Sequence, residues 1–212
     1  MIAVYTAIFG DYDTLKAPLF IDTLVDYIVF TDAPHLVTPF PWQVRTVTAP
    51  HSNPGKASRF YFDQSCRALP EYKYTVMHGA NALLNCEASY LLSFLRGNDI
   101  AAFRHPHRNN VYDEQKVIIQ MGKDRAENTT AQMKRYRSEG FPCTTLTACT
   151  LLVRRNTPAL RQFEDLWWEE VRNGSYRDQL SFDYCRWRLD MGVSYLPGTL
   201  FSTDYFKVGS HK

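Results

Sequence analysis

The chain has 212 residues, of which 45% are hydrophobic and 22% charged, and its net charge is +2. This length fits one domain with a sizeable core, and so small a charge does not by itself indicate nucleic-acid binding. Five scattered cysteines without a Cys-x-x-Cys pair favour free thiols over disulfides or a zinc site, and no signal peptide or membrane span is evident, so we expect a cytoplasmic protein.

Apolar, β-rich runs alternate with amphipathic segments along the chain. Strands are expected at residues 1–9, 26–31, 42–49, 73–77, 99–105 and 144–155. Helices are expected within residues 52–69, 87–96, 111–122, 125–140, 158–171 and 176–192. The polar helix at 125–140 should be exposed, and the tail from residue 193 should be irregular. The alternation predicts one α/β domain over residues 1–212, with a mostly parallel central sheet flanked by helices.

In such sheets, ligands bind beyond the carboxyl ends of the strands. Gly10 directly follows the first strand, where a glycine lets the backbone approach a flat ligand and where Phe9 or Tyr12 could stack on it. The surrounding sequence is neither a dinucleotide fingerprint nor a P-loop. The alternative is a simple tight turn, which Gly and Asp mark in many proteins.

Lys56 and Arg59 lie three residues apart in the first turns of the helix expected near residue 54. Their side chains should project from one face of that helix. A helix N-terminus also offers unpaired N–H groups and the positive end of the dipole, so this position favours a phosphate. The alternative is a pair of solvated surface charges.

Two further clusters carry polar chemistry. Arg104 and His105 end a strand and could contact an anionic or hydroxylated ligand, although a surface loop is the alternative and no third zinc ligand is near. Asp178, beside Gln179, stands at the start of the last helix. A carboxylate there stays ionised and could accept a proton from a hydroxyl or orient it. The alternative is that Asp178 only caps the helix.

Seven segments occur in a fixed order from Val4 to Phe182: VYTAIFGDYDTLKAP, DYIVFTD, NPGKASRFYF, YTVMHGAN, AAFRHPHRNNVYDE, GFP and RDQLSF. On these segments, the chain resembles a glycosyltransferase-like family of bacteria and plants long known as a domain of unknown function. Members of that family look like nucleotide-sugar transferases of the GT-A fold. The resemblance implies a Rossmann-like GT-A domain that moves a sugar from a nucleotide donor, with a UDP-sugar favoured, to an acceptor it does not identify.

The resemblance also implies roles for individual residues. The residues expected to bind the nucleotide donor are Thr6, Phe9, Gly10, Asp11, Tyr12, Asp32, Lys56, Arg59, His78, Gly79 and Asn81. Arg104 and His105 would line the sugar or acceptor side. Asp178, with Gln179, would be the carboxylate near the reacting carbon.

The turn after Met77 departs from the family pattern. GT-A enzymes usually keep an Asp-x-Asp motif there for a divalent ion, but this chain has His78 and no acidic residue between Thr75 and Glu87. Mg²⁺ and Mn²⁺ prefer carboxylate oxygens. His78 could instead be a nitrogen ligand for Mn²⁺, or transfer could be metal-independent, with basic side chains neutralising the diphosphate. A catalytically inactive nucleotide-binding protein is the third alternative.

The acceptor could be a glycan, a small molecule or a hydroxylated base in DNA. The basic stretch at residues 134–137 is the only feature that favours nucleic acid, and a solvated helix face is by far the more common origin of such a stretch.

Overall fold

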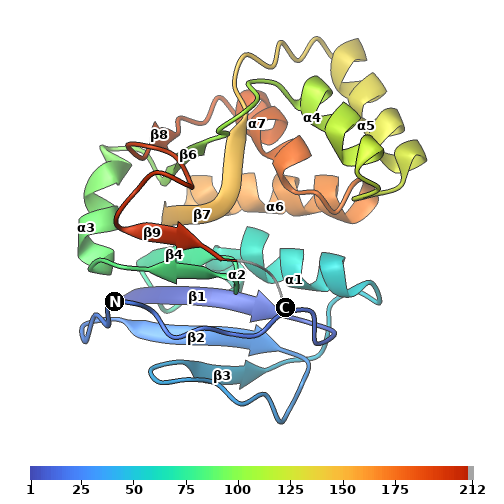
Figure 1. Ribbon diagram of the computed structural model, residues 1–212. Coiled ribbons are helices and arrows are strands. Elements are labelled where there is room, and N and C mark those ends of the chain that lie inside the picture. Colours follow the sequence, from blue (N-terminus) through green and yellow to red (C-terminus); the bar gives the residue numbers. More distant parts are fainter. Residues whose placement is uncertain (210–212) are drawn as a thin grey trace.

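A seven-stranded sheet in the order β3-β2-β1-β4-β7-β6-β8 forms the centre of the computed structural model, which describes residues 1–209 (Figure 1). Its strands are β1 (Ile2–Ile8), β2 (Asp26–Thr31), β3 (Gln43–Thr46), β4 (Tyr74–His78), β6 (Ile100–Arg104), β7 (Thr147–Arg155) and β8 (Ser194–Tyr195). Neighbouring strands are parallel except that β7 runs antiparallel to both β4 and β6. The predicted α/β class with a mostly parallel sheet is therefore confirmed.

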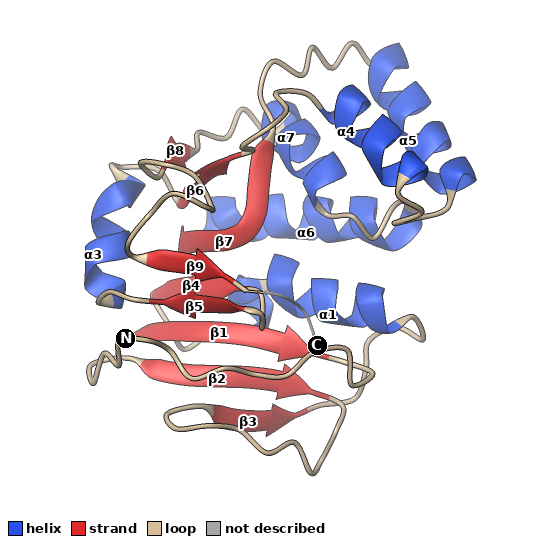
Figure 2. Cartoon of the chain, in the orientation of Figure 1, coloured by secondary structure: helices blue, strands red, loops and turns tan. Residues whose placement is uncertain are grey.

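The helices lie mainly on one face of this sheet (Figure 2). They are α1 (Pro54–Asp63), α2 (Ser65–Ala68), α3 (Ala88–Leu92), the 3-10 turn η1 (Ser93–Leu95), α4 (Val111–Gln120), α5 (Ala126–Ser138), α6 (Pro158–Asn173) and α7 (Gln179–Arg188). The α3 helix and a separate antiparallel pair, β5 (Ala82–Leu84) and β9 (Phe206–Val208), cover the other face.

The two faces follow from the alternation of side chains along buried strands. On β1, Tyr5 and Ala7 pack into the layer formed with α1, α6 and α7. Val4 and Ile8 pack into the layer formed with α3, β5 and β9. Because β1 is buried on both sides, its sequence is a continuous apolar run rather than an alternating one.

Several elements differ from the sequence-based expectation. The helix expected within 52–69 breaks at Gln64, whose backbone leaves the helical region, so α1 and α2 are separate. The helix expected at 87–96 is one α-turn followed by a 3-10 turn, ending where Arg96 adopts a left-handed conformation. The regular part of the run at 144–155 begins only at Thr147.

One expectation was wrong in kind. The tail from residue 193 contains β8 and β9, which are too short to show a periodic pattern and form only because β6 and β5 supply their pairing partners. The α5 helix is exposed along most of its length, as expected, and its buried positions Thr129, Gln132, Met133 and Tyr136 pack toward the rest of the protein. Gln132 on this buried face makes buried hydrogen bonds, which hydropathy alone does not reveal.

The topology gathers the strand ends at one edge. β1, β2, β4, β6 and β8 finish at this carboxyl edge, and the antiparallel β7 begins there. Most residues selected from the sequence therefore lie at or near one edge of the sheet. None of the helices within residues 1–209 has both the length and the apolar character needed to cross a membrane.

Candidate functional site at the carboxyl edge

The loops after β1 and β2 are joined at the carboxyl edge. The backbone N–H of Gly10 donates a hydrogen bond to Asp32 Oδ1 over 3.2 Å. Gly10 has a φ of 63°, and a Cβ there would lie 2.9 Å from Pro54 Cβ. Only glycine suits this left-handed, crowded position. Gly10 thus allows the first turn of α1 to approach the loop after β1.

The aromatic residues beside Gly10 have different environments. Phe9 is only 1% exposed and stacks on Tyr61 in the core, with ring centroids 5.4 Å apart. Tyr12 is 68% exposed. Of the two rings expected to stack on a ligand, Tyr12 is therefore accessible and Phe9 is not. Thr6 lies farther back in β1 and is fully buried, and Asp11 is exposed in a left-handed conformation.

The N-terminus of α1 points its cations toward the loop between α6 and α7. Asn53 caps the helix by accepting a hydrogen bond from the Lys56 N–H over 3.1 Å. Lys56 Nζ donates to the carbonyls of Arg172 and Gly174, over 2.7 and 3.1 Å. Burial lowers the pKa of Lys56. Lys56 is thus a held side chain and not a freely solvated charge.

Arg59 and Asp178 form an ion pair, which the sequence did not predict although it selected both residues. Arg59 Nη1 lies 2.7 Å from Asp178 Oδ2, and the side chains are 22% and 6% exposed. Burial disfavours the charged guanidinium, but nearby Asp178 and Asp63 outweigh that effect and raise the pKa of Arg59. The arginine therefore keeps its charge beside the start of α7.

Asp178 also caps α7, as the alternative interpretation of this residue expected. Its Oδ1 accepts a hydrogen bond from the Gln179 N–H over 2.8 Å, and its backbone carbonyl accepts one from Trp167 Nε1 over 3.0 Å. Within residues 1–209, the buried Nε2 of Gln179 has no hydrogen-bond partner. Asp178 is only 5% exposed, and Arg59 engages its other carboxylate oxygen, Oδ2.

A second carboxyl group lies beneath this pair. Asp63 is fully buried at the end of α1, and neither of its oxygens has a hydrogen-bond partner within the described chain. Burial first, and the nearby Asp178 second, raises its pKa well above the usual range. The raised pKa favours the protonated, neutral form of Asp63 beside the ion pair of Arg59 and Asp178. The sequence offered one signal for Asp63, an acidic residue on the apolar side of α1.

The loop that precedes Asp178 is held from α5 and from the segment before it. Gln132 Oε1 accepts from the Ser175 N–H over 3.0 Å, and Asp124 Oδ2 accepts from the Tyr176 N–H over 3.1 Å. A Cβ on Gly174 would lie 2.7 Å from the Gln132 side chain. These contacts define where residues 174–178 can lie.

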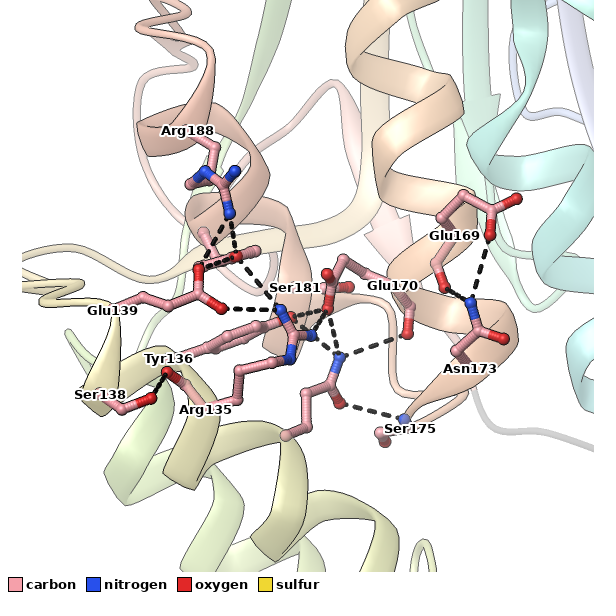
Figure 3. Close-up of polar contacts among 12 residues, drawn as sticks. Arg135, Tyr136, Ser138, Glu139, Glu169, Glu170, Asn173, Ser175, Ser181 and Arg188 are labelled. Carbon is pink, nitrogen blue, oxygen red and sulfur yellow. Dashed lines mark hydrogen bonds and ion pairs between the residues drawn. The ribbon is translucent and has the colours of Figure 1, made fainter.

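Charged side chains also connect α5 to α6 (Figure 3). Glu170 is paired with Arg135 and accepts a hydrogen bond from the Tyr136 hydroxyl over 2.7 Å. Arg135 also contacts Glu139 over 3.3 Å. Arg137, the other arginine of this basic stretch, lies 4.2 Å from the centre of the Tyr112 ring. Both arginines are therefore engaged within the protein.

His78 lies apart from these groups, in the layer on the other face of the sheet. It is 2% exposed, and its ring meets those of Trp42 and Phe206 at centroid distances of 5.7 and 6.4 Å. Nδ1 donates to the Gly79 carbonyl over 2.9 Å. Burial lowers the pKa of His78 to about 4. The imidazole is therefore neutral at physiological pH, and within the described chain its Nε2 has no partner.

The turn after β4 does not supply the ligands that Mg²⁺ or Mn²⁺ prefers. His78 offers one buried nitrogen, and the Asn81 side chain donates to the Gly209 carbonyl over 2.9 Å. Within residues 1–209, no group of three His, Cys, Asp or Glu side chains is placed to hold a metal ion. The donor set present here does not match that of a hard divalent cation.

A second polar group lies where β6, β7 and β8 meet. The Arg104 guanidinium stacks 3.9 Å from the centre of the Tyr195 ring. The Tyr195 hydroxyl and Thr147 Oγ1 are 3.2 Å apart, and Asp183 Oδ1 accepts from Thr147 Oγ1 over 2.9 Å. Burial raises the pKa of Asp183. Sequence reasoning missed Tyr195, Thr147 and Asp183, and the one available signal was an acidic residue within the apolar stripe of α7.

His105 follows Arg104 but belongs to a different contact set. Its Nδ1 accepts from the Arg108 N–H over 3.0 Å, and its Nε2 lies 3.8 Å from Glu114 Oε2. Burial lowers the pKa of His105. The structure therefore forms two separate groups of polar side chains at α7. One group includes Asp178, and the other includes Asp183. His78, Gly79 and Asn81 lie outside both groups.

No curated protein matches the chain. Among solved structures, it is similar to the apo structure of WbbM, a bifunctional glycosyltransferase, with a TM-score of 0.49 and 10% identity over 92% of this chain. The match spans 38% of the length of WbbM. It is also similar to mouse xyloside xylosyltransferase 1 in its apo form, with a TM-score of 0.46, 9% identity, and coverage of 92% of this chain and 84% of that one.

A family profile gives the more specific result. The profile described as TOD1/MUCI70, glycosyltransferase-like domain, matches residues 43–209. The matched range includes Lys56, Arg59, Arg104 and Asp178, whereas the loops after β1 and β2 precede it. The match covers well over half of the sequence, and the expected resemblance to a glycosyltransferase-like family is confirmed. This chain belongs to the TOD1/MUCI70 glycosyltransferase-like domain family.

Proposed function

We propose that this protein transfers a sugar from a nucleotide donor, a UDP-sugar, to an acceptor hydroxyl. The observation that carries the proposal is the arrangement at α1. Its N-terminus lies against the joined loops after β1 and β2, and Arg59 on the same helix meets Asp178. A nucleotide at these loops would place its phosphates beside a helix N-terminus and two cations, a combination that favours anions.

In this proposal, the loop at Gly10 and Asp32 holds the base and ribose, with the exposed Tyr12 ring beside them. Thr6 and Phe9 support the loop from within the core, where the structure places them. Lys56 and Arg59 then face the diphosphate. His78, Gly79 and Asn81 shape the neighbouring turn, and His78 acts without positive charge because its pKa is about 4.

Transfer requires that the bond between the sugar carbon and the diphosphate oxygen breaks while the acceptor oxygen bonds to that carbon. Negative charge grows on the leaving diphosphate, and fixed cations stabilise it most at the transition state. We assign that role to Arg59 and Lys56, in transfer that does not depend on a metal. When the diphosphate binds Arg59, the Asp178 carboxylate loses its partner and becomes available to the reacting sugar or to the acceptor proton.

Arg104 and His105 are assigned to the sugar or acceptor side, together with Tyr195. Gln179, whose side-chain nitrogen is unpaired within residues 1–209, would donate to the ligand beside Asp178. Within the described chain all five cysteines are free thiols, which suits the reducing cytoplasm that we propose as the compartment.

The DNA-modifying alternative receives less support. Two arginines of the basic stretch on α5 are engaged with Glu170 and with the Tyr112 ring. Salt-sensitive binding to duplex DNA at low ionic strength would revive this alternative.

A thermal-shift panel of UDP, GDP and CDP, each with and without Mn²⁺, tests the proposal. A ligand that binds the native state raises the melting temperature according to RT ln(1 + [L]/Kd). UDP should stabilise the protein with little further effect of Mn²⁺. UDP-sugar hydrolysis should be lost in Asp178→Ala. If none of the three nucleotides shifts the melt, the proposal fails; a UDP shift without turnover of any donor favours the inactive nucleotide-binding alternative.

A further inference from the structure

A hollow of about 520 Å³ lies away from the groups described above, between α3 and the segment that joins β8 to β9. Its lining residues include Asn85, Tyr90, Ser202, Thr203, Asp204 and Tyr205. None of the proposed donor residues contributes to it. The hollow is large enough for a saccharide of one or two rings, and its lining combines aromatic rings with hydroxyl, amide and carboxylate groups.

The aromatic part of the lining is firmly supported. Tyr90 packs edge-on against Phe94 and Tyr205, at centroid distances of 5.1 and 5.8 Å, yet remains 47% exposed. Tyr205 in turn stacks against Phe103 of the central sheet, with centroids 6.1 Å apart. A half-exposed ring with fixed neighbours presents apolar surface at a low cost in conformational entropy. That surface suits the C–H face of a sugar ring.

The polar part of the lining is held by backbone contacts. Asn85 Nδ2 donates to the Asp204 carbonyl over 2.9 Å, and the Asn85 N–H donates to the Tyr205 carbonyl over 3.0 Å. The Tyr205 hydroxyl donates to the Pro197 carbonyl over 2.6 Å. These bonds use the Asn85 amide nitrogen and leave its oxygen as an acceptor. This wall of the hollow is therefore preorganised for a ligand.

Charge narrows the class of ligand. Asp204 is exposed, and its carboxylate has no partner within the described chain. No Lys or Arg is among the lining residues, so the hollow has no cation to match a phosphate or an acidic sugar. A carboxylate accepts hydrogen bonds from sugar hydroxyls, and it repels anions at this range. The lining fits a neutral saccharide and opposes nucleic acid.

The segment that forms the hollow also reaches the carboxyl edge. It begins directly after Tyr195, on which Arg104 stacks. Phe201, from the middle of the segment, stacks on His107 with ring centroids 6.2 Å apart. A saccharide of several units bound in the hollow would thus lie along a segment whose other contacts are to the residues that follow β6.

We propose that this hollow binds a neutral oligosaccharide, which serves as the acceptor. The acceptor role rests on the proposed transferase function, whereas binding of a neutral saccharide does not.

Saturation-transfer difference NMR tests the binding with the full chain and with four neutral disaccharides: cellobiose, maltose, lactose and N,N′-diacetylchitobiose. Glucuronic acid and glycerol serve as the charged and the non-ring probes. At least one neutral disaccharide should receive saturation, and glycerol should not. Tyr90→Ala should weaken that binding about tenfold, because the stacking surface is lost. Asp204→Asn should weaken it less and should improve the signal from glucuronic acid.

Val37→Ala is the control, since Val37 is 91% exposed in the segment between β2 and β3, outside the hollow. It should leave every signal unchanged. If Tyr90→Ala has a lower melting temperature than the wild type, the proposal is tested by the effect of the surface variant Asp204→Asn on disaccharide binding. Absence of saturation from all four disaccharides overturns the proposal, as does binding that neither variant alters.

The UDP melt separates this inference from the proposed function. A UDP shift without disaccharide binding removes the saccharide site and leaves the transferase proposal intact. Disaccharide binding that depends on Tyr90, without any nucleotide shift, keeps the saccharide site and removes the transferase proposal together with the acceptor role.

Discussion

At the scale of single residues, the charge of His78 is decided by what surrounds it. Trp42 and Phe206 exclude water from the ring, and the single hydrogen bond to the Gly79 carbonyl does not offset that loss. Removing the hydration of an imidazolium favours the neutral form. A residue that occupies the place of an expected metal ligand is therefore part of an apolar layer.

This packing makes stability depend on pH. The pKa of His78 falls from 6.5 to about 4 on folding. Between pH 6.5 and pH 4, His78 is therefore protonated in the unfolded chain and neutral in the native state. Stability is retained above pH 6.5 and decreases as the pH falls toward 4, by roughly 3 kcal/mol from this residue. In urea unfolding across this window, His78→Phe should lose less stability than the wild type. His35→Phe, at an exposed histidine, should keep the wild-type dependence; equal slopes for wild type and His78→Phe would contradict the assignment.

The Arg59–Asp178 pair permits a second test at this scale. Arg59→Ala leaves a carboxylate that is 6% exposed without its cation. Removing one partner from a buried pair costs about 3–5 kcal/mol, and the partial exposure of Arg59 reduces this to about 1–3 kcal/mol. Urea unfolding should show that loss, and the UDP-induced melting shift should disappear as well.

Arg67→Ala is the matched control for that variant. It removes an arginine from an ion pair with Asp165 whose side chains are 49% and 39% exposed. Its cost should be under about 1 kcal/mol, with the UDP shift preserved. If Arg59→Ala retains the full UDP shift, Arg59 does not contact the nucleotide.

At the scale of elements, the position of Asp178 depends on α5 and on the loop that α5 supports. Gln132 uses its oxygen for the Ser175 N–H and its nitrogen for the Tyr136 hydroxyl, over 3.0 and 2.9 Å. Figure 3 shows Ser175 and Tyr136 within the same set of polar contacts. Although the sequence of α5 is strongly polar, this helix supports the loop that precedes Asp178 at the candidate site.

Gln132→Met removes these hydrogen bonds while nearly keeping the side-chain volume. The buried N–H of Ser175 would then lack an acceptor, which costs about 1–3 kcal/mol. We expect a lower free energy of unfolding and a slower donor turnover, with the UDP-induced melting shift retained. Asn173→Ala removes an exposed side-chain amide that, among residues 1–209, bonds only to Glu169, and it should cost under about 0.5 kcal/mol. Equal unfolding energies for the two variants would argue against support from α5.

At the scale of the whole molecule, the last strand completes the second apolar layer. Phe206 of β9 is 1% exposed and packs against Phe103 of β6 and the ring of His78. Its strand pairs with β5, far away along the chain. The C-terminal segment therefore stabilises the central sheet and forms a wall of the proposed saccharide site.

Phe206→Ala should cost about 3–5 kcal/mol, because it opens a cavity in this layer. The expected result in calorimetry is a large drop in melting temperature. Phe201→Ala, at a ring that is 67% exposed, should change the melting temperature only slightly. Similar effects of the two variants would show that β9 does not contribute to the core.

Elements whose pattern is local could be predicted from the amino-acid sequence. Continuous apolar runs identified β1, β2 and β4, and the Thr157–Pro158 start with its apolar stripe identified α6. The rule that ligands lie beyond the ends of parallel strands then selected Gly10, Asp32 and Arg104 for the carboxyl edge. The predictions of these elements succeed because the backbone period and the burial of a strand or helix are set by neighbouring residues.

The tertiary structure alone decided which side chains meet. The ion pair of Arg59 with Asp178 spans 119 positions, and the bond between the Thr147 and Tyr195 hydroxyls spans 48. It also decided that Phe9 is core, that His78 is neutral, and that β8 and β9 form at all. Each of these depends on desolvation or pairing by segments distant in sequence, and no local pattern carries that information.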